Sequence, residues 1–449
     1  MMRKAIAGMA AGVVLTFLTA GSVAAIEIER VVSPGGIEAW LVQDHRNPIV
    51  AVEFAFKGGA SLDPAGKSGL ASLTAALIDE GAGEMDSQAF RGQMDENSIG
   101  LSFSAGRDEF TGSLSSLSET RDLAFDLLRL ALSEPRFDAD AVARIRSQVM
   151  VGLVQQEESP DAIAGKALRT LFFGDHPYGR DQEGTIKSVQ DITVEDMQTL
   201  VKERFALDSL KISVVGDLTP EELSALLDRT FGGLPKTSDR PAIPDIEIVA
   251  TGDLVVIEKN LPQSVVTFGQ QGIRRNDPDY YAAYIVNYIL GGGGMSSRLY
   301  KEIREKRGLA YSVYSYLNPL DHAALIAGGV ATQNARVSES LEVLRAEWKR
   351  MADEGPSAQD LAEAKTFLTG SFPLRLSGSD QIAGMVLGMQ LADLGIDYLD
   401  QRNSYIEAVT LEQAQRVARE LFKPESLTVV VVGRPENVKA TRPAPDGNT

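Results

Sequence analysis

The sequence predicts an α+β fold of two tandem homologous domains, each a mainly antiparallel sheet covered by helices. Three observations support this: an internal repeat, a linker-like segment midway along the chain, and strands and helices that come in blocks rather than in strict alternation. The repeat aligns residues 193–216 with residues 410–433 without a gap, and 10 of the 24 aligned positions are identical. Two matching helix-then-strand units of this kind indicate duplicated domains.

The domain boundaries follow from composition. Residues 235–244, PKTSDRPAIP, are rich in proline and polar residues, as linkers are. We therefore expect an N-terminal domain at 26–234 and a C-terminal domain at 245–436. Residues 437–449 are polar and proline-rich, and we expect a disordered tail there.

The expected elements follow the hydrophobic pattern of each segment. In the first domain we expect, in order, strand 50–56, helix 68–79, strands 99–105 and 109–114, and helices 120–133 and 138–158. In the second domain we expect strands 254–258 and 264–269, helices 280–290 and 296–307, strands 310–316 and 323–329, and helices 337–353 and 358–374. The second series repeats the plan of the first.

The first 25 residues are predicted to be a signal peptide. Arg3 and Lys4 form a basic start, residues 5–20 are apolar, and residues 22–25 offer small side chains for cleavage. The alternative is an uncleaved membrane anchor, because the apolar run is nearly long enough to span a bilayer. We expect cleavage at the end of this segment and a periplasmic protein.

The net charge and the absence of cysteine indicate which partners and which stabilising bonds to expect. The formal charge at pH 7 is −18, from 44 Lys and Arg against 62 Asp and Glu, and it becomes −20 without Arg3 and Lys4. This excess repels nucleic acid and anionic membrane surfaces, so we expect neither as a partner of the cleaved chain. The chain has no cysteine, so an exported form must be stabilised by its core rather than by disulfides.

Residues 291–316, GGGGMSSRLYKEIREKRGLAYSVYSY, form the most distinctive motif of the chain. Its glycine run, Gly291, Gly292, Gly293 and Gly294, directly follows an apolar helix. Glycines let the backbone adopt positive φ and let another chain approach closely. The alternatives are a flexible loop or a helix C-terminus; no Gly-Lys-Ser/Thr follows, which argues against a phosphate loop.

This motif resembles the substrate-binding segment of the insulinase/pitrilysin-type zinc peptidases, the inverzincins, which include the mitochondrial-processing-peptidase-like proteins. The resemblance extends over nearly all of the chain after residue 25 and implies the processing-peptidase-like metallohydrolase fold. The family's other hallmark, H-x-x-E-H on a helix, is missing. The chain has three histidines, His45, His176 and His322, and no two of them can share a helical turn.

The resemblance places small residues where the family has its metal site. Ser72 and Ala76 stand at the two metal histidines, Ala75 at the catalytic glutamate, and Gly152 at the distal metal glutamate. None of these residues supplies the imidazole or carboxylate that a catalytic zinc requires. A nucleophilic role for Ser72 is disfavoured because no G-x-S-x-G surrounds it. We therefore expect a degenerate zinc site and no metal or cofactor in this chain.

The resemblance assigns a second set of residues to substrate binding. The family has an Arg and a Tyr separated by six residues, and Arg304 and Tyr311 match that spacing. The implied roles are a Tyr hydroxyl that hydrogen-bonds the peptide carbonyl as charge develops, and an Arg that helps to hold the substrate backbone. Gly291 to Gly294 would complete the substrate-binding surface. Without the resemblance, Arg304 would be interpreted as a surface charge and Tyr311 as a strand aromatic.

Together these patterns predict the zinc-free subunit of a heterodimeric periplasmic zinc metallopeptidase. Zinc and water activation would come from a homologous partner that carries H-x-x-E-H, and the substrate would be a peptide. The alternative is a non-catalytic structural or peptide-binding protein of the same fold. The two hypotheses differ in whether Arg304 and Tyr311 act in a partner's active site.

Overall fold

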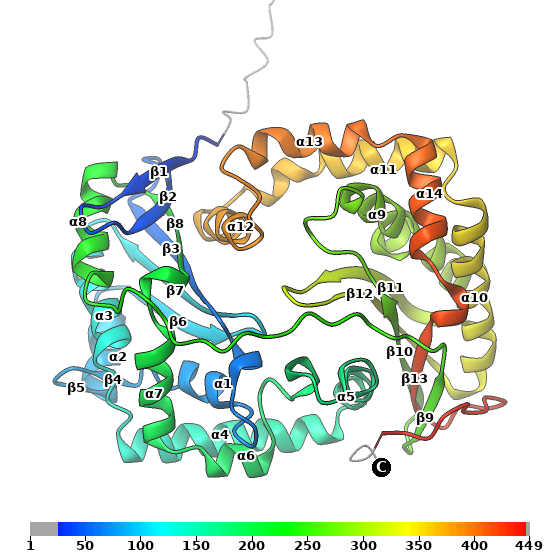
Figure 1. Cartoon of the computed structure of the whole chain (residues 1–449), viewed down its shortest axis with the longest axis horizontal. Helices are drawn as coiled ribbons and strands as arrows, with labels where there is room; N and C mark the ends of the chain where they lie inside the picture. The colour runs from blue at the N-terminus through cyan, green and yellow to red at the C-terminus, as the bar shows by residue number, and fades with distance from the viewer. Residues whose placement is uncertain (1–25, 446–449) are drawn as a thin grey trace, which may run out of the picture.

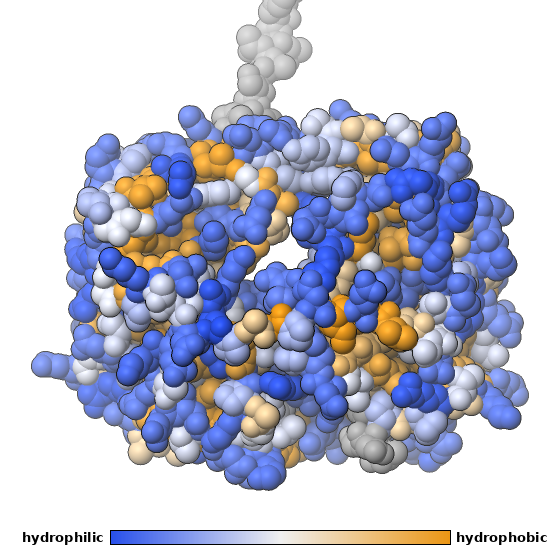
Figure 2. All heavy atoms as spheres, in the orientation of Figure 1, coloured by the Kyte–Doolittle hydropathy of each residue, from blue (hydrophilic) through white to orange (hydrophobic). Residues whose placement is uncertain are grey.

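The computed structural model describes residues 26–445, so the predicted signal peptide and the last four residues lie outside the described part of the chain. The chain forms two halves that each contain one large sheet, with their helices arranged around the sheets (Figure 1). A space-filling view shows an opening between the two halves (Figure 2). Within residues 26–445, no helix is both long and apolar enough for a membrane span.

The first half is built on a six-stranded sheet with strand order β1-β2-β8-β3-β7-β6. Its strands are β1 (Glu29–Val32), β2 (Glu38–Gln43), β3 (Ile49–Lys57), β6 (Gly100–Ala105), β7 (Glu109–Leu117) and β8 (Leu210–Gly216). A small hairpin adds β4 (Gly81–Ala82) and β5 (Met85–Asp86). All pairs are antiparallel except β2 with β8.

The second half is built on a five-stranded sheet with strand order β11-β12-β10-β13-β9. Its strands are β9 (Leu254–Glu258), β10 (Gln263–Gln271), β11 (Ala310–Pro319), β12 (Ala324–Gln333) and β13 (Thr428–Gly433). Only β9 and β13 are parallel. The order β2-β8-β3-β7-β6 in the first sheet therefore recurs as β9-β13-β10-β12-β11, which confirms two homologous, mainly antiparallel units.

Helices cover both sheets. The first half contributes α1 (Leu70–Ala75), α2 (Ser87–Glu96), α3 (Arg121–Ser133), α4 (Ala139–Glu158), α5 (Pro160–Phe173), α6 (Ile186–Asp191), α7 (Val194–Arg204) and α8 (Pro220–Phe231). The second half contributes α9 (Tyr280–Asn287), α10 (Val337–Glu354), α11 (Ala358–Gly370), α12 (Ser379–Leu391), α13 (Tyr398–Ala408) and α14 (Leu411–Leu421). The repeated segments are α7 with β8 and α14 with β13. Each of these two helices begins with a threonine capping box, at Thr193 and Thr410.

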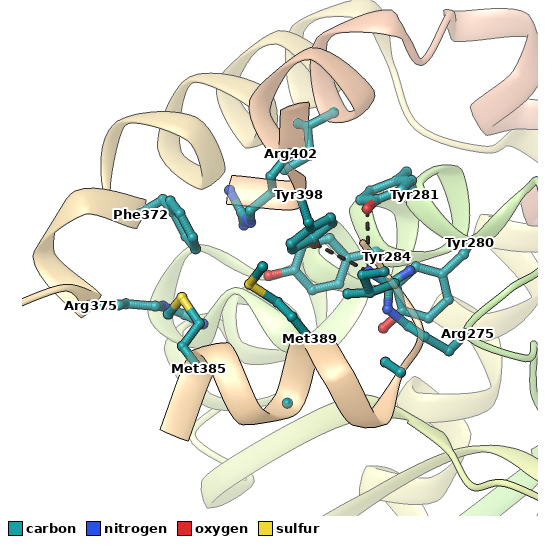
Figure 3. Close-up of a pocket in the computed structure, with 14 residues that line it drawn as sticks. Arg275, Tyr280, Tyr281, Tyr284, Phe372, Arg375, Met385, Met389, Tyr398 and Arg402 are labelled. Atoms are coloured by element: carbon teal, nitrogen blue, oxygen red, sulfur yellow. Dashed lines mark hydrogen bonds between the residues drawn. The ribbon is translucent and has the colours of Figure 1, made fainter. Parts of the chain in front are cut away.

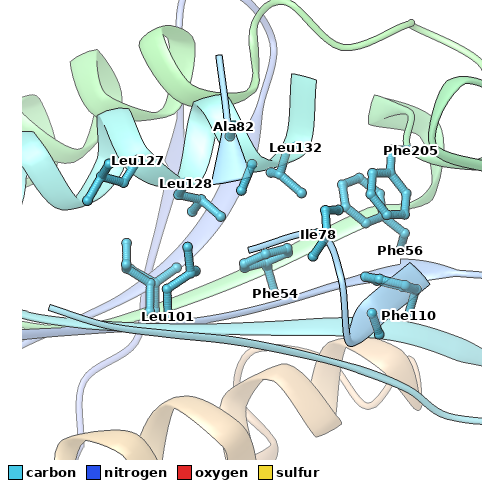
Figure 4. Packing of buried hydrophobic residues seen from close by; sticks show 14 of the residues in the cluster. Phe54, Phe56, Ile78, Ala82, Leu101, Phe110, Leu127, Leu128, Leu132 and Phe205 are labelled. Atoms are coloured by element: carbon cyan, nitrogen blue, oxygen red, sulfur yellow. The ribbon is translucent and has the colours of Figure 1, made fainter. Parts of the chain in front are cut away.

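The core of the first half is aromatic where β3 meets the helices. Phe54 and Phe56 are fully buried on one face of the strand, as the period-two pattern dictates. The ring of Phe56 stacks on Phe205 at 4.5 Å, and Ile78 and Leu128 belong to the same cluster (Figure 4). Burying one such side chain contributes about 1.5–3 kcal/mol to the free energy of folding. This aromatic layer therefore constrains the path of the segment that follows β3.

In each half, one helix packs against the sheet of the other half. Helix α5 packs on β10 and β13, and its Ala164 and Leu168 join a buried cluster with Val430. Helix α12 packs on β3 and β8, as Figure 1 shows, and its Gln390 amide donates to the Ile212 carbonyl at 2.8 Å. The sequence pattern did not predict this exchange. It covers the second face of each sheet and ties the halves together.

A buried tyrosine joins the two halves at a second point. The hydroxyl of Tyr178 donates to Asp108 at 2.5 Å and accepts the backbone N–H of His322 at 3.0 Å. Burial, together with the Asp108 hydrogen bond, raises the pKa of Tyr178, which keeps its proton in place. Asp108 belongs to the β6–β7 turn and His322 to the β11–β12 turn, so one side chain links corresponding hairpins of the two sheets.

The segment between α8 and β9 contains no helix or strand, and the predicted linker 235–244 lies within it. The tail differs from its prediction over the residues that the structure describes. Although residues 437–449 were expected to be disordered, the Thr441 N–H donates to the Leu254 carbonyl at 2.8 Å, and Arg442 pairs with Asp253 at 3.4 Å. These contacts place the first part of the tail beside β9.

Candidate functional site

The helix that would carry the metal ligands is shorter than predicted. We expected a helix over 68–79, but α1 spans only Leu70–Ala75. Gly69 precedes it with φ of 89°, and the carboxylate of Asp63 accepts the Ala71 N–H at 3.2 Å. Arg204 contacts this carboxylate at 3.4 Å, while burial raises the pKa of Asp63 to about 6. The buried pair therefore fixes where the helix starts.

The end of α1 is set by packing rather than by a capping residue. The chain turns immediately after Ala76, and Leu77 and Ile78 are fully buried in the core. Glu80 follows, buried between the guanidinium groups of Arg91 and Arg144. Burial opposes ionisation of Glu80, but the Arg144 hydrogen bond holds its pKa below the usual range. This carboxylate is occupied by its ion pairs, so it cannot replace a missing metal ligand.

The four degenerate positions have different surroundings. Ser72 is half-buried and its hydroxyl donates to the Gln182 carbonyl at 2.9 Å. Ala75 is 4% exposed and belongs to the core, and Ala76 is half-buried. A Cβ added at Gly152 on α4 would meet nothing within 4 Å. The side chains at these four positions do not fit a zinc ion, because none supplies an imidazole, thiolate or carboxylate ligand. Within residues 26–445, no cluster of three His, Cys, Asp or Glu side chains could hold a metal.

The glycine run follows the end of α9 and packs closely against strand β11. After α9 the chain widens into a π-helical turn, η4 (Tyr288–Gly292). Gly291 is buried, and a Cβ there would lie 2.3 Å from the hydroxyl of Ser315 on β11. Asn287 and Ser315 hydrogen-bond beside it at 2.8 Å. Gly291 thus permits close packing, which is a structural role in addition to the substrate-binding role that the resemblance implies.

The remaining glycines are more accessible. Gly292 and Gly294 are exposed and Gly293 is half-buried. Gly294 has φ of 55°, a left-handed conformation that favours glycine. Ser297 donates to the Gly294 carbonyl at 2.7 Å and holds this turn in place. The run therefore combines one packed residue with three that reach the surface.

The helix predicted at 296–307 is also altered. A 3₁₀ turn, η5 (Gly294–Ser296), is followed by a second π-helical turn, η6 (Tyr300–Glu305). Such wide turns are rare and occur frequently at functional sites. Arg298 anchors the segment through Asp360 at 2.7 Å. The wide turn brings Arg304 back over the start of β11.

Arg304 and Tyr311 are in direct contact. The guanidinium of Arg304 lies 4.6 Å from the centre of the Tyr311 ring and 5.2 Å from that of Tyr300, and it donates to the Tyr311 carbonyl. The Tyr311 side chain is 76% exposed. Among the described residues, its hydroxyl has no hydrogen-bond partner and Arg304 has no carboxylate partner within 4.0 Å. The structure thus brings Arg304 of the π-helical turn η6 beside Tyr311 at the start of the edge strand β11.

The sequence analysis missed a second cluster of polar groups in this half. A cavity of about 350 Å³ lies between α9, α12 and α13, and Figure 3 shows Arg275 within it among the rings of Tyr280, Tyr281 and Tyr398. The guanidinium carbon is 4.2 Å from the centre of the Tyr280 ring. A sequence signal was present, since two arginines precede three tyrosines within residues 274–284, but the fourth tyrosine comes from a distant helix.

Comparisons with known proteins agree with this fold. Residues 191–368 match the family model described as the peptidase M16 inactive domain. This segment of the chain is therefore similar to an M16 inactive domain. It is 29% identical over 334 residues to the "Non-peptidase homolog YmxG" of Helicobacter pylori, an alignment that covers 74% of this chain and 77% of that protein. The expected membership among insulinase/pitrilysin-type proteins is thus confirmed.

Solved structures confirm the fold. A peptidase M16 inactive domain from Pseudomonas fluorescens aligns with a TM-score of 0.86 and 28% identity, covering 94% of this chain and all of that one. The periplasmic protease PqqL of Escherichia coli has the same fold, with a TM-score of 0.77 and 17% identity. The alignment covers 97% of this chain but 49% of PqqL, which therefore contains about twice as much chain.

Proposed function

We propose that this chain is the zinc-free subunit of a heterodimeric periplasmic zinc metallopeptidase. The observation that carries the proposal is the contrast between its two sites. The helix at the degenerate zinc site is packed and lacks metal donors, whereas Arg304 and Tyr311 stay accessible, and within the described residues Arg304 has no carboxylate partner and the Tyr311 hydroxyl no hydrogen-bond partner. An accessible hydrogen-bond donor beside a fixed positive charge suits a substrate carbonyl better than a folding role.

The division of labour follows from the chemistry of each group. A partner that carries H-x-x-E-H would supply zinc, which activates water, together with the general base. This chain would supply the Tyr311 hydroxyl to the oxygen of the scissile carbonyl as negative charge develops there. Arg304 would keep that hydroxyl in place by stacking on its ring, and its remaining N–H groups would contact the substrate backbone. Gly292 to Gly294 would let the peptide approach the turn closely.

The test is co-purification from the native host, followed by kinetics of the assembled complex. The expected result is a bound homologous chain with H-x-x-E-H, and Tyr311→Phe should lower kcat by about 10²–10³ without changing assembly. Tyr314→Phe is the matched control, because Tyr314 is on the same strand and is 49% exposed. Wild-type kcat from a properly assembled Tyr311→Phe complex would refute the catalytic role.

A non-catalytic structural or peptide-binding role is the second candidate. The relative named a non-peptidase homolog favours it, because that name denies peptidase activity to a protein of similar length. This candidate predicts that no H-x-x-E-H chain co-purifies. It also predicts that Arg304→Ala affects peptide affinity or stability but no rate. The same co-purification and kinetic measurements therefore separate the two candidates.

A further inference from the structure

The cavity around Arg275 has the composition of a small-molecule site. Its wall is mainly aromatic and aliphatic, and α12 contributes Met385 and Met389 from the face opposite to the one that packs on the first sheet (Figure 3). Its volume of about 350 Å³ lies at the lower end of the range for ligand pockets. A cavity of this size accommodates a ligand no larger than one or two amino-acid residues.

Three arginines line this mostly apolar cavity: Arg275, Arg375 and Arg402. Arg275 donates to the hydroxyls of Tyr281 and Tyr398 at 3.3 and 3.2 Å, and Arg402 stacks 4.0 Å from the centre of the Phe372 ring. Within residues 26–445, none of the three arginines forms an ion pair within 4.0 Å. In a chain with 62 acidic and 44 basic side chains, the convergence of three unneutralised arginines on one cavity produces a local positive potential.

We propose that this cavity binds a carboxylate attached to an apolar or aromatic body. The carboxylate would accept hydrogen bonds from the free N–H groups of Arg275, whose planar fork suits two carboxylate oxygens. Burial raises the pKa of Tyr280 and Tyr398, so these hydroxyls remain protonated and can donate as well. Tyr284, Met385 and Met389 would cover the apolar body.

The shape of the site favours a ligand with one charged end. Arg275, Gly388 and Ala392 also line a neighbouring cavity of about 400 Å³. Besides Arg107, that second cavity carries three acids, Asp108, Glu109 and Asp321, which come from the corresponding hairpins of the two halves. These acids repel a second negative charge, so the apolar end of the ligand lies among the methionines. A peptide C-terminus and a free organic acid share this chemistry.

The experiment is calorimetric titration of the purified chain with three probes. N-acetyl-phenylalanine represents a peptide C-terminus, octanoate a free acid, and N-acetyl-phenylalanine amide the neutral analogue. At least one carboxylate should bind, and the amide should bind at least tenfold more weakly than the acid. Stronger binding of the first probe would identify a peptide end as the source, and stronger binding of octanoate a free acid.

Two pairs of variants locate the binding. Arg275→Gln should weaken carboxylate binding by about 10- to 100-fold, whereas Arg274→Gln should not, because Arg274 pairs with Asp245 at 3.1 Å instead. Gly388→Leu should abolish binding by filling the cavity, and Gly384→Leu is its control on the same helix. An added Cβ meets nothing within 4 Å at either glycine, so both variants should fold. Equal binding of acid and amide, or unchanged binding to Arg275→Gln, would overturn the proposal.

Discussion

The segments that follow β3 and β10 occupy corresponding positions in the two halves, yet they differ in structure and in exposure. Each lies between the central strand and the edge hairpin of its sheet. In the first half this segment includes α1, where Ala75 is in the core, Ala76 packs against it and the Ser72 hydroxyl donates to the Gln182 carbonyl. In the second half it is α9 followed by two π-helical turns, which leave Arg304 and Tyr311 accessible.

The difference is between a packed helix that lacks metal ligands and an irregular segment whose polar groups are accessible. Polar ligands on a buried helix lower stability unless a metal compensates them, so small residues take their place once the metal is gone. Ala75, at the position that the resemblance assigns to the catalytic glutamate, is likewise a small residue buried in the core. At the second site, wide helical turns and a left-handed glycine persist although regular helix would be more stable. Such irregularity favours a retained role in binding.

The largest expected effect comes from placing a glutamate at the position that the resemblance assigns to the catalytic base. Ala75→Glu places a carboxylate in an apolar core, because Ala75 is buried in the hydrophobic cluster of the first half, and it should lower the free energy of unfolding by about 3–5 kcal/mol. Gly152→Glu is the comparison variant, because it adds the same side chain at another position of the degenerate site, where there is open space. The space beside Gly152 is open and glycine has a low helix propensity. The free energy of unfolding of this variant should therefore rise by up to about 1 kcal/mol.

Chemical denaturation of both variants checks this prediction. If Ala75→Glu were as stable as the wild-type chain, the first site would still be able to accommodate a charge. The contrast between a closed and an open half would then fail. Zinc added to the Ala75→Glu variant should not restore stability, because the neighbouring positions Ser72 and Ala76 supply no histidine.

Much of this contrast could be predicted from the sequence, because it depends on local patterns. The repeat identified the two homologous units, and period-two alternation placed the edge hairpins, including β7 with its strictly alternating burial. The absence of H-x-x-E-H predicted the degenerate site. The spacing of Arg304 and Tyr311 identified the pair, although their roles remain a proposal.

The rest depends on tertiary contacts that no local pattern encodes. Residues 68–79 have helical periodicity, but Leu77 and Ile78 are drawn into the core and Glu80 toward two arginines, so the helix ends early. The exchange of α5 and α12 requires the opposite half. The Arg275 cavity combines side chains more than 100 residues apart, such as Tyr281 and Tyr398, so only the folded chain reveals it.

A medium effect is expected at the glycine run, where it separates packing from binding. Gly291→Ala would place its Cβ 2.3 Å from Ser315, which should lower the free energy of unfolding by about 1–3 kcal/mol. Gly294→Asn should stay within about 0.5 kcal/mol, because asparagine tolerates left-handed backbone and the site is open. Thermal unfolding of both variants is the measurement. Equal losses would show that the run acts as one structural unit, without a separate exposed part.

The smallest effect is expected where the two halves meet, at Glu109. Burial, followed by the negative charges of Asp108 and Asp321, raises the pKa of Glu109 to about 7. A carboxyl with a raised pKa binds its proton more tightly in the folded state. Its contribution to stability is therefore complete below the unfolded pKa of about 4.5 and is lost as pH rises through 7. Asp63 and Asp79, whose pKa values burial raises to about 6, act in the same direction.

Acidification from pH 8 to pH 5.5 should accordingly raise the melting temperature of the wild-type chain. Glu109→Gln removes the charge, so it should raise Tm by about 2–4 °C at pH 8 and change it little at pH 5.5. Glu84→Gln is the control, because Glu84 is exposed, and it should leave Tm unchanged at both values. Calorimetry at the two pH values measures the difference. A gain in Tm that comes from removing the Glu109 charge must shrink at pH 5.5, because the wild-type carboxyl is then protonated. If Glu109→Gln raised Tm equally at both pH values, the protonation of Glu109 would not affect stability and the prediction would be wrong.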